Sequence, residues 1–179
     1  MSLAVVQTRA SAGIKAPRVT VETHISNGLP SLSIVGLPGT SVKESRDRVR
    51  SALLNTQFEF PARRITINLA PADLPKQGSR FDLAIALSIL AASHQIPSDA
   101  LWQYEFIGEL ALSGELRPVS GILPFALAAQ KANHMVILPV ENAQEASFNQ
   151  KTIILPAQNI LQICAHLQCR DFLPRFQFT

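Results

Sequence analysis

The run Leu83–Ala92 restricts the fold of this chain most strongly, because its ten residues are apolar except for Ser88. A helix that is apolar all round must be buried all round, so the rest of the chain has to surround it. The run is too short to cross a bilayer, which takes about 20 residues. We therefore predict a central helix inside one core, with Asp82 capping its amino end because the helix dipole favours an acid there.

Short segments rich in Val, Ile and Leu and bounded by turn residues predict strands on both sides of this helix. Further helices are predicted from apolar residues at helical spacing, the first of them opened by a Ser41–Glu44 capping box. The predicted strands are 3–8, 19–24, 32–35, 64–69, 106–112, 116–119, 135–138 and 152–155, and the predicted helices 41–54, 124–132, 143–148 and 157–168. Strands first, then strands mixed with helices, indicate an α+β fold in which helices pack on a mixed sheet.

A chain of 179 residues with 47% hydrophobic residues is long enough for one well-packed core and too short for two full domains. We place this domain at residues 1–169. Residues 170–179 have no periodicity and are interpreted as a linker or a cut end. The chain shows no secretion leader, and the spacing of Cys164 and Cys169 fits neither a redox pair nor a zinc site. A cytoplasmic protein without membrane contact is expected.

Basic residues are concentrated in the first half of the chain. Residues 1–80 contain eleven Lys and Arg against five Asp and Glu, whereas residues 81–179 contain five against eight. Such a split favours an anionic partner for the first half, either nucleic acid or another acidic surface, with ordinary surface variation as the alternative.

Two Pro- and Gly-containing segments carry a resemblance to a known family. They are 28–38, which continues into the helix at 42–52, and 68–83; Gly108-Glu109-Leu110 and 114–119 add to them. Together they resemble the amino-terminal domain of the ComM/YifB family of Mg-chelatase-like ATPases, over residues 1 to about 168. Similar segments occur in the Lon-like domain of RadA recombination helicases. The resemblance implies a Lon-protease C-terminal-like fold of the ribosomal protein S5 domain 2-like type.

The family resemblance also implies a larger assembly. In the family this domain precedes an AAA+ motor that binds ATP and Mg, forms a hexameric ring and drives branch migration of DNA in natural transformation. The partners implied are therefore further copies of the chain and DNA. No cofactor is expected in this chain, because a P-loop needs a Gly-Lys-Ser/Thr sequence. Its only look-alike, Gly36–Ser41, lacks that sequence and contains Pro38, which has no amide to donate.

Peptidase activity on a Lon-like fold requires a Ser-Lys dyad. The resemblance aligns Pro75–Gly78 with the segment before the Lon serine and Pro118–Ile122 with the segment before the Lon lysine, which puts Arg80 and Leu123 at the two catalytic positions. Arg has no attacking oxygen and Leu cannot accept a proton. The resemblance thus implies a domain with no catalytic residues. A residual hydrolase that uses Ser79 or another hydroxyl is a rival hypothesis, and it predicts labelling by serine-directed probes.

Candidate DNA contacts come from two places in the sequence. One is a stripe of Lys43, Arg46 and Arg50, which lie within about 60° of one another on the first predicted helix. The other is a group that the resemblance places around the former Lon cleft, namely Arg63, Arg64, Lys76 and Arg80. Lys and Arg suit phosphates without reading base sequence. The predicted DNA-contacting residues are Lys43, Arg46, Arg50, Arg63, Arg64, Lys76 and Arg80.

The same residues have other interpretations. The helix stripe can be a solvated face, with Glu44 and Arg48 forming an i,i+4 pair. Arg80 can pair with Asp73, Asp82 or a carboxylate of a neighbouring subunit. The histidines are scattered without metal-ligand spacing, so no metal site is predicted. We therefore predict a non-catalytic assembly and DNA-engagement domain, with a purely structural oligomerisation domain as the alternative.

Overall fold

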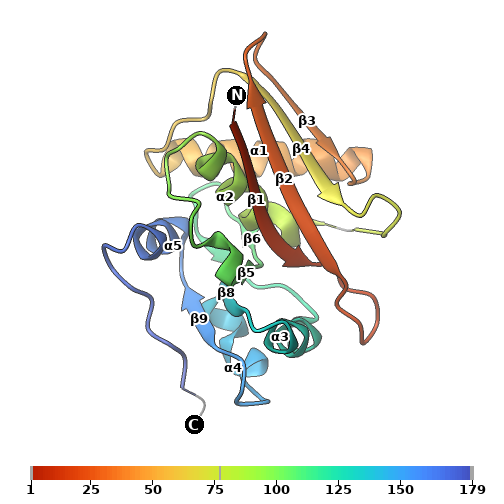
Figure 1. Ribbon diagram of the computed structural model, residues 1–179, viewed down its shortest axis with the longest axis vertical. Coiled ribbons are helices and arrows are strands. Elements are labelled where there is room, and N and C mark those ends of the chain that lie inside the picture. Colours follow the sequence, from red (N-terminus) through yellow and green to blue (C-terminus); the bar gives the residue numbers. More distant parts are fainter. Residues whose placement is uncertain (1, 77, 178–179) are drawn as a thin grey trace.

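The computed structural model describes residues 2–76 and 78–177 (Figure 1). The first half contains the strands β1 (Ser2–Arg9), β2 (Arg18–Ser26), β3 (Ser31–Val35) and β4 (Arg64–Ala70), and the helices α1 (Gly39–Asn55) and α2 (Asp82–Ala92). The second half contains β5 (Tyr104–Phe106), β6 (Glu109–Leu110), β7 (Leu116–Arg117), α3 (Ile122–Lys131), β8 (Met135–Pro139), α4 (Ala143–Ala146), β9 (Ile154–Ala157) and α5 (Ile160–Leu167). The predicted α+β class with a mixed sheet is confirmed.

The larger sheet has the strand order β1-β2-β4-β3. β2 is antiparallel to β1 and β4, whereas β3 runs parallel to β4 because α1 connects them. Buried and more exposed residues alternate along β2 and β4, so one face of the sheet is covered and the other is open. The helices α1 and α2 lie on the covered face (Figure 1).

The predicted central helix is confirmed as α2, in which every residue is buried. It packs against β1 and β2 on one side and against α1 on another. Ser88, its one polar residue after Asp82, is hydrogen-bonded to Thr23 of β2 through their hydroxyl oxygens at 2.6 Å and also donates to the carbonyl of Ile85. The apolar run is therefore buried on every face, and the hydroxyl of Ser88 within it is hydrogen-bonded.

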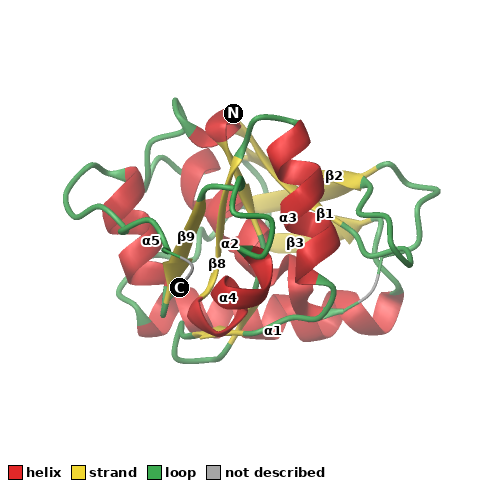
Figure 2. Ribbon diagram, turned by 90° about the horizontal axis from the view of Figure 1, so that it is seen from below, coloured by secondary structure: helices red, strands yellow, loops and turns green. Residues whose placement is uncertain are grey.

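A second layer is built on the parallel strands β5-β8-β9. α5 lies on one side of them, and α3 and α4 lie on the other (Figure 2). Phe125 of α3, Val136 and Leu138 of β8 and Ile154 of β9 belong to a small core of their own. The predicted hairpin is present as β6 and β7, in a shorter form than the sequence indicated.

Both predicted helix caps are wrong. α1 begins at Gly39, two residues before Ser41, and no side chain caps it. The chain enters it through Gly36, which has a φ of 101° and stands where an added Cβ would lie 2.4 Å from the carbonyl oxygen of Leu69. Asp82 does not cap α2 either, since a 3-10 turn over Ser79–Phe81 precedes the helix and the Asp82 carboxylate bonds to α1 instead.

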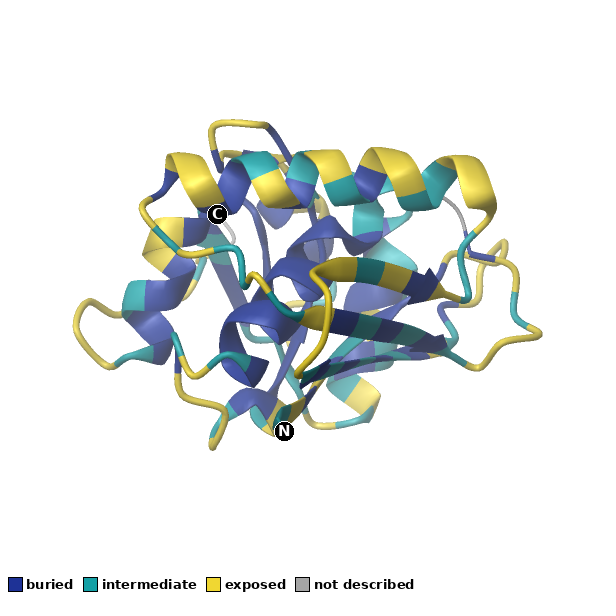
Figure 3. Cartoon of the chain, turned by 90° about the horizontal axis from the view of Figure 1, so that it is seen from above, coloured by how far each residue is buried: buried dark blue, intermediate teal, exposed yellow. Residues whose placement is uncertain are grey.

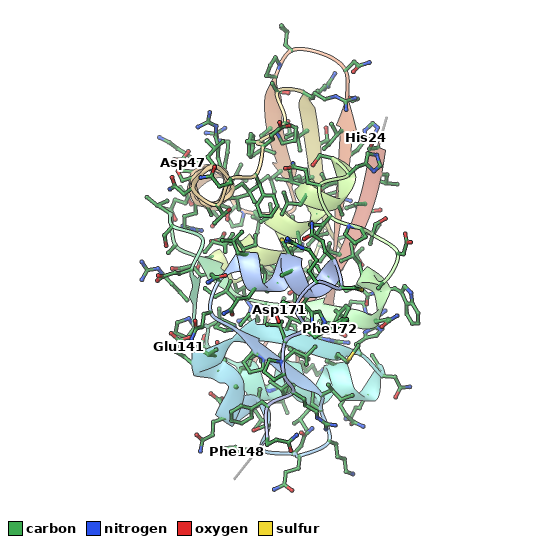
Figure 4. The ribbon with its side chains drawn as sticks, turned by 90° about the vertical axis from the view of Figure 1, so that its left-hand side faces the viewer. His24, Asp47, Glu141, Phe148, Asp171 and Phe172 are labelled. Atoms are coloured by element: carbon green, nitrogen blue, oxygen red, sulfur yellow. The ribbon has the colours of Figure 1, made fainter. Side chains whose placement is uncertain are left out.

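Residues 170–177 return along the domain. The backbone amide of Leu173 donates to Nδ1 of His166 at 2.9 Å, and the amide of Phe176 donates to the carbonyl of Ile154 at 2.8 Å. Figure 4 shows Asp171 and Phe172 on this segment, which runs from α5 across β9. Nε2 of His166 lies 2.9 Å from the Tyr104 hydroxyl. Because Nδ1 accepts a hydrogen bond, the imidazole is neutral here, and burial lowers the pKa of His166.

This arrangement predicts a loss of stability at acid pH. The unfolded imidazole takes up a proton near about pH 6.5, whereas the folded one resists protonation, so the unfolded state binds more protons as the pH falls through this window. The free energy of unfolding should therefore decrease from neutral pH toward the lowered pKa of folded His166. Urea titrations across this range check the sign, and His166→Leu should remove this component of the pH dependence. An identical pH profile in that variant would contradict the prediction.

Candidate functional site

The two motif loops that the Lon resemblance singled out meet in the structure. They line a cavity of about 510 Å³ together with the end of the β1–β2 hairpin. Nη1 of Arg80 donates to the carbonyl of Ser120 at 3.1 Å and so connects one loop to the other. The lining residues are Ser11, Pro75, Gly78, Ser79, Arg80, Pro118, Val119 and Ser120. Ser11 was missed, because nothing in its local sequence indicates that its hairpin reaches these loops.

The two positions aligned with the Lon dyad are not equivalent in space. Arg80 lines the cavity, whereas Leu123 lies in the first turn of α3, is half-buried, and is not among the lining residues. Ser79 lines the cavity, but no Lys or His side chain hydrogen-bonds to it within the described ranges. The cavity therefore presents a guanidinium and a hydroxyl without a base in contact with the hydroxyl.

Lys76 is not a surface cation, and Arg80 is only partly exposed. The side chain of Lys76 is buried, and its Nζ donates to the carbonyls of Pro71 and Leu74, the latter at 3.0 Å. Burial lowers the pKa of Lys76, opposed by the charge of Asp73, and burial also lowers the pKa of Arg80. Arg80 forms an ion pair with neither of the intramolecular partners considered, Asp73 and Asp82.

The stripe on α1 faces solvent. Lys43 and Arg50 are exposed and Arg46 is partly exposed, while Val49, Ala52 and Leu53 of the same helix are buried (Figure 3). The Arg50 guanidinium lies 5.8 Å from the centre of the Phe60 ring, a distance that suits a cation–π contact. The three cations therefore lie on the outer side of a helix whose inner side is fixed in the core.

Arg63 and Arg64 lie away from the cavity, contrary to the prediction. They precede and begin β4, next to the β2–β3 turn, and Arg63 donates to Oδ1 of Asn27 at 3.1 Å. The loop that leads to Arg80 leaves β4 at its other end, after Ala70. At about 3.3 Å per residue, the strand separates the two groups by roughly 20 Å. The resemblance had placed Arg63 and Arg64 around the former Lon cleft with Arg80, and the structure does not bring them there.

A buried ion pair fixes α1 against α2. Nε and Nη2 of Arg48 donate to the two carboxylate oxygens of Asp82 at 2.6 and 3.2 Å. The hydroxyl of Ser45 and the backbone amide of Leu110 donate to the same carboxylate. Burial raises the pKa of Asp82 and these hydrogen bonds oppose that shift, while the bond to Asp82 raises the pKa of Arg48. The predicted Glu44–Arg48 pair is present at 3.9 Å but is the weaker of the two.

No group of three or more His, Cys, Asp or Glu side chains is placed to hold a metal ion in residues 2–76 and 78–177. In the same ranges, no helix is both long enough and apolar enough to cross a bilayer.

Comparison with known proteins gives the class of this α+β domain, which is that of Mg-chelatase-like domains with similarity to Lon proteases. Residues 21–142 match the family model described as subunit ChlI of Mg-chelatase, and the chain belongs to this family.

Individual relatives agree with this assignment. The chain is 54% identical over 174 residues to Competence protein ComM of Haemophilus influenzae, which covers 97% of this chain and 34% of that protein. It is 53% identical over 175 residues to the uncharacterized protein YifB of Salmonella typhimurium, covering 98% of this chain and 35% of that protein. Lon protease 2 of Bacillus subtilis is 35% identical over 75 residues, 41% of this chain and 13% of the protease. The chain thus spans about a third of the length of ComM and YifB.

Proposed function

We propose that this chain is a non-catalytic assembly and DNA-engagement domain of a cytoplasmic, ComM-like hexameric AAA+ ATPase that acts in branch migration during DNA uptake. Its fold is of the Lon-protease C-terminal-like, ribosomal protein S5 domain 2-like type. ATP and Mg act in the motor module of the full-length protein. The observation that carries the proposal is the row of Lys43, Arg46 and Arg50 on α1, in which Lys43 and Arg50 are exposed and Arg46 is partly exposed.

The contacts that hold α1 against the rest of the domain support this function. Arg48 and Ser45 bind the buried Asp82, and Val49 and Leu53 enter the core, so the helix cannot easily turn. Three cations on a fixed helix can follow a phosphate backbone without contacts to bases. Lys76 and Arg80 are left out of this surface because their charged groups are largely buried. Arg63 and Arg64 would form a separate contact at the far end of β4.

We expect that changing Lys43, Arg46 and Arg50 together to Glu weakens DNA binding. Each lost phosphate contact reduces the slope of log affinity against log salt by about 0.9 for duplex DNA, so the slope should become shallower by roughly 2 to 3. Fluorescence anisotropy of a labelled duplex, measured across a salt titration, gives the slope. Asp47 is an exposed acid on the same helix (Figure 4), and Asp47→Asn should shift affinity in the opposite direction.

A matched control separates this surface from net charge. Changing Arg117, Lys131 and Lys151 to Glu alters the charge equally, at exposed positions outside α1. The control should retain most of the affinity of the unchanged chain. Equal losses in the two triple variants would leave only a general charge effect and would remove α1 from the DNA surface.

A purely structural oligomerisation domain is the second candidate. The open face of the larger sheet favours it, because Leu3, Val5 and Val35 are exposed there. This function predicts concentration-dependent self-association in sedimentation experiments and no more DNA binding than an acidic control protein shows.

A further inference from the structure

The proposed function does not use the side of the Arg80 guanidinium that carries Nε and Nη2, which we call its unpaired edge. Nη1 of Arg80 bonds to the Ser120 carbonyl, but Nε and Nη2 are buried and hydrogen-bond to no residue that the structure describes. Leaving charged donors buried without acceptors is costly, because their lost hydration is not replaced. An acceptor supplied from outside the domain would remove this cost.

Two other arginines use the same two atoms, Nε and Nη2, to bind a carboxylate. Arg9 donates from Nε and Nη2 to the two oxygens of Glu105, at 2.6 and 2.9 Å. Arg48 donates from the same two atoms to the two oxygens of Asp82. These two N–H bonds of a guanidinium point the same way and match the spacing of carboxylate oxygens. Arg80 has the same pair of donors as Arg9 and Arg48, but no carboxylate of the described residues accepts from them.

The surroundings of Arg80 suit a single negative charge. Arg80 is the one charged residue among those that line the cavity in the described part of the chain, and Ser11, Ser79 and Ser120 add hydroxyl groups. A carboxylate would meet no acidic side chain there. A nucleic acid strand would bring several phosphates to a cavity with one cation, so its other charges would remain unmatched.

From the cavity and this unpaired edge we infer that the domain binds a peptide carboxylate, held side-on by Nε and Nη2 of Arg80 between residues 78–80 and 118–120. The carboxylate belongs to an acidic side chain or to the carboxyl terminus of a peptide. Because the edge is covered, the guanidinium turns toward the cavity as the ligand enters and exchanges its bond to Ser120 for bonds to the ligand. This site is distinct from the DNA surface proposed on α1.

Nuclear magnetic resonance of the ¹⁵N-labelled chain tests this inference. The probe is acetyl-Ala-Glu-Ala-amide, and its neutral counterpart is acetyl-Ala-Gln-Ala-amide. The Arg80 Nε–H signal, assigned by triple-resonance spectra of the unchanged chain, should move saturably with the Glu peptide and remain in place with the Gln peptide. Acetyl-Ala-Ala-Ala with a free carboxyl terminus distinguishes a terminal carboxylate from a side chain. Dimethyl phosphate tests a phosphate ligand.

The variants give a second readout. Arg80→Lys keeps the charge but loses the two-pronged donor, so affinity for the Glu peptide, followed by amide signals of the cavity loops, should fall about tenfold. Arg64→Lys makes the same change at the far end of β4 and should have no effect. Lys43, Arg46 and Arg50 changed to Glu should also leave peptide binding intact, which separates this site from the DNA surface.

Three results would overturn the inference. They are an Arg80 signal that responds neither to the Glu peptide nor to the peptide with a free carboxyl terminus, an equal response to the Glu and Gln peptides, and tighter binding of dimethyl phosphate than of either carboxylate peptide. The first two comparisons use the unchanged chain, so they decide the matter even where Arg80→Lys fails to fold.

Discussion

Glu105→Gln should destabilise this domain by about 3–5 kcal/mol, the cost typical of breaking a buried ion pair from one side. Glu105 is completely buried, and it accepts hydrogen bonds from Arg9 and, at 2.8 Å, from Nδ1 of His134. Arg9 lies in β1 and Glu105 in β5, so the pair connects the larger sheet to the second layer. An amide in place of the carboxylate leaves the Arg9 charge buried without compensation. Thermal and urea denaturation measure the effect.

The control for this prediction is Glu109→Gln. Glu109 forms a longer, more exposed ion pair with Arg117 at 3.7 Å, and such pairs contribute about 0–1 kcal/mol. The double variant Arg9→Met, Glu105→Leu removes both charges and should recover much of the stability that Glu105→Gln loses. Stability of Glu105→Gln within about 1 kcal/mol of the unchanged chain would contradict our account of the pair.

Asp82→Ala should cost a comparable amount, about 3–5 kcal/mol. It leaves Arg48 without its main partner and removes the acceptor for Ser45 and for the amide of Leu110. The loss should appear as a lower melting temperature and, where the variant still folds, as faster hydrogen exchange at the α1–α2 contact.

Glu44→Gln provides the matched control for Asp82. It removes the other carboxylate that Arg48 contacts, but Glu44 is exposed and the atoms are 3.9 Å apart, so the expected change is below about 0.5 kcal/mol. A similar loss in Glu44→Gln and Asp82→Ala would show that Arg48 is not anchored by the buried carboxylate.

Local sequence pattern predicted the elements of this fold well where burial alone decides them. The apolar run at 83–92 could only be interior, and the α1 stripe followed from helical spacing. The predicted Asp82 cap failed because Asp82 has the partly buried Arg48 within reach, and a tertiary ion pair outweighs a local cap. The predicted capping box failed because α1 begins at Gly39, before Ser41. No local pattern contains Arg48 and Asp82 together, since they are far apart in the chain and meet only when α1 packs on α2.

The candidate site was only partly predictable. The resemblance brought residues 78–80 and 118–120 together correctly, because long motifs carry tertiary information that composition does not. It could not tell that Lys76 turns inward to loop carbonyls, or that Arg63 and Arg64 lie at the opposite end of β4. The sequence shows that a basic side chain is present, but whether that side chain points inward or toward solvent depends on the packing around it.

The close approach at Gly36 has a consequence for how this domain can diversify. With the Leu69 carbonyl oxygen 2.4 Å from the position of a Cβ, even Ala at 36 would push the entry to α1 away from β4. The helix would then shift as a unit, because its interior residues and its outward cations share one rigid backbone. Mutational libraries aimed at the DNA surface proposed on α1 should therefore vary the outward positions freely and keep glycine at 36.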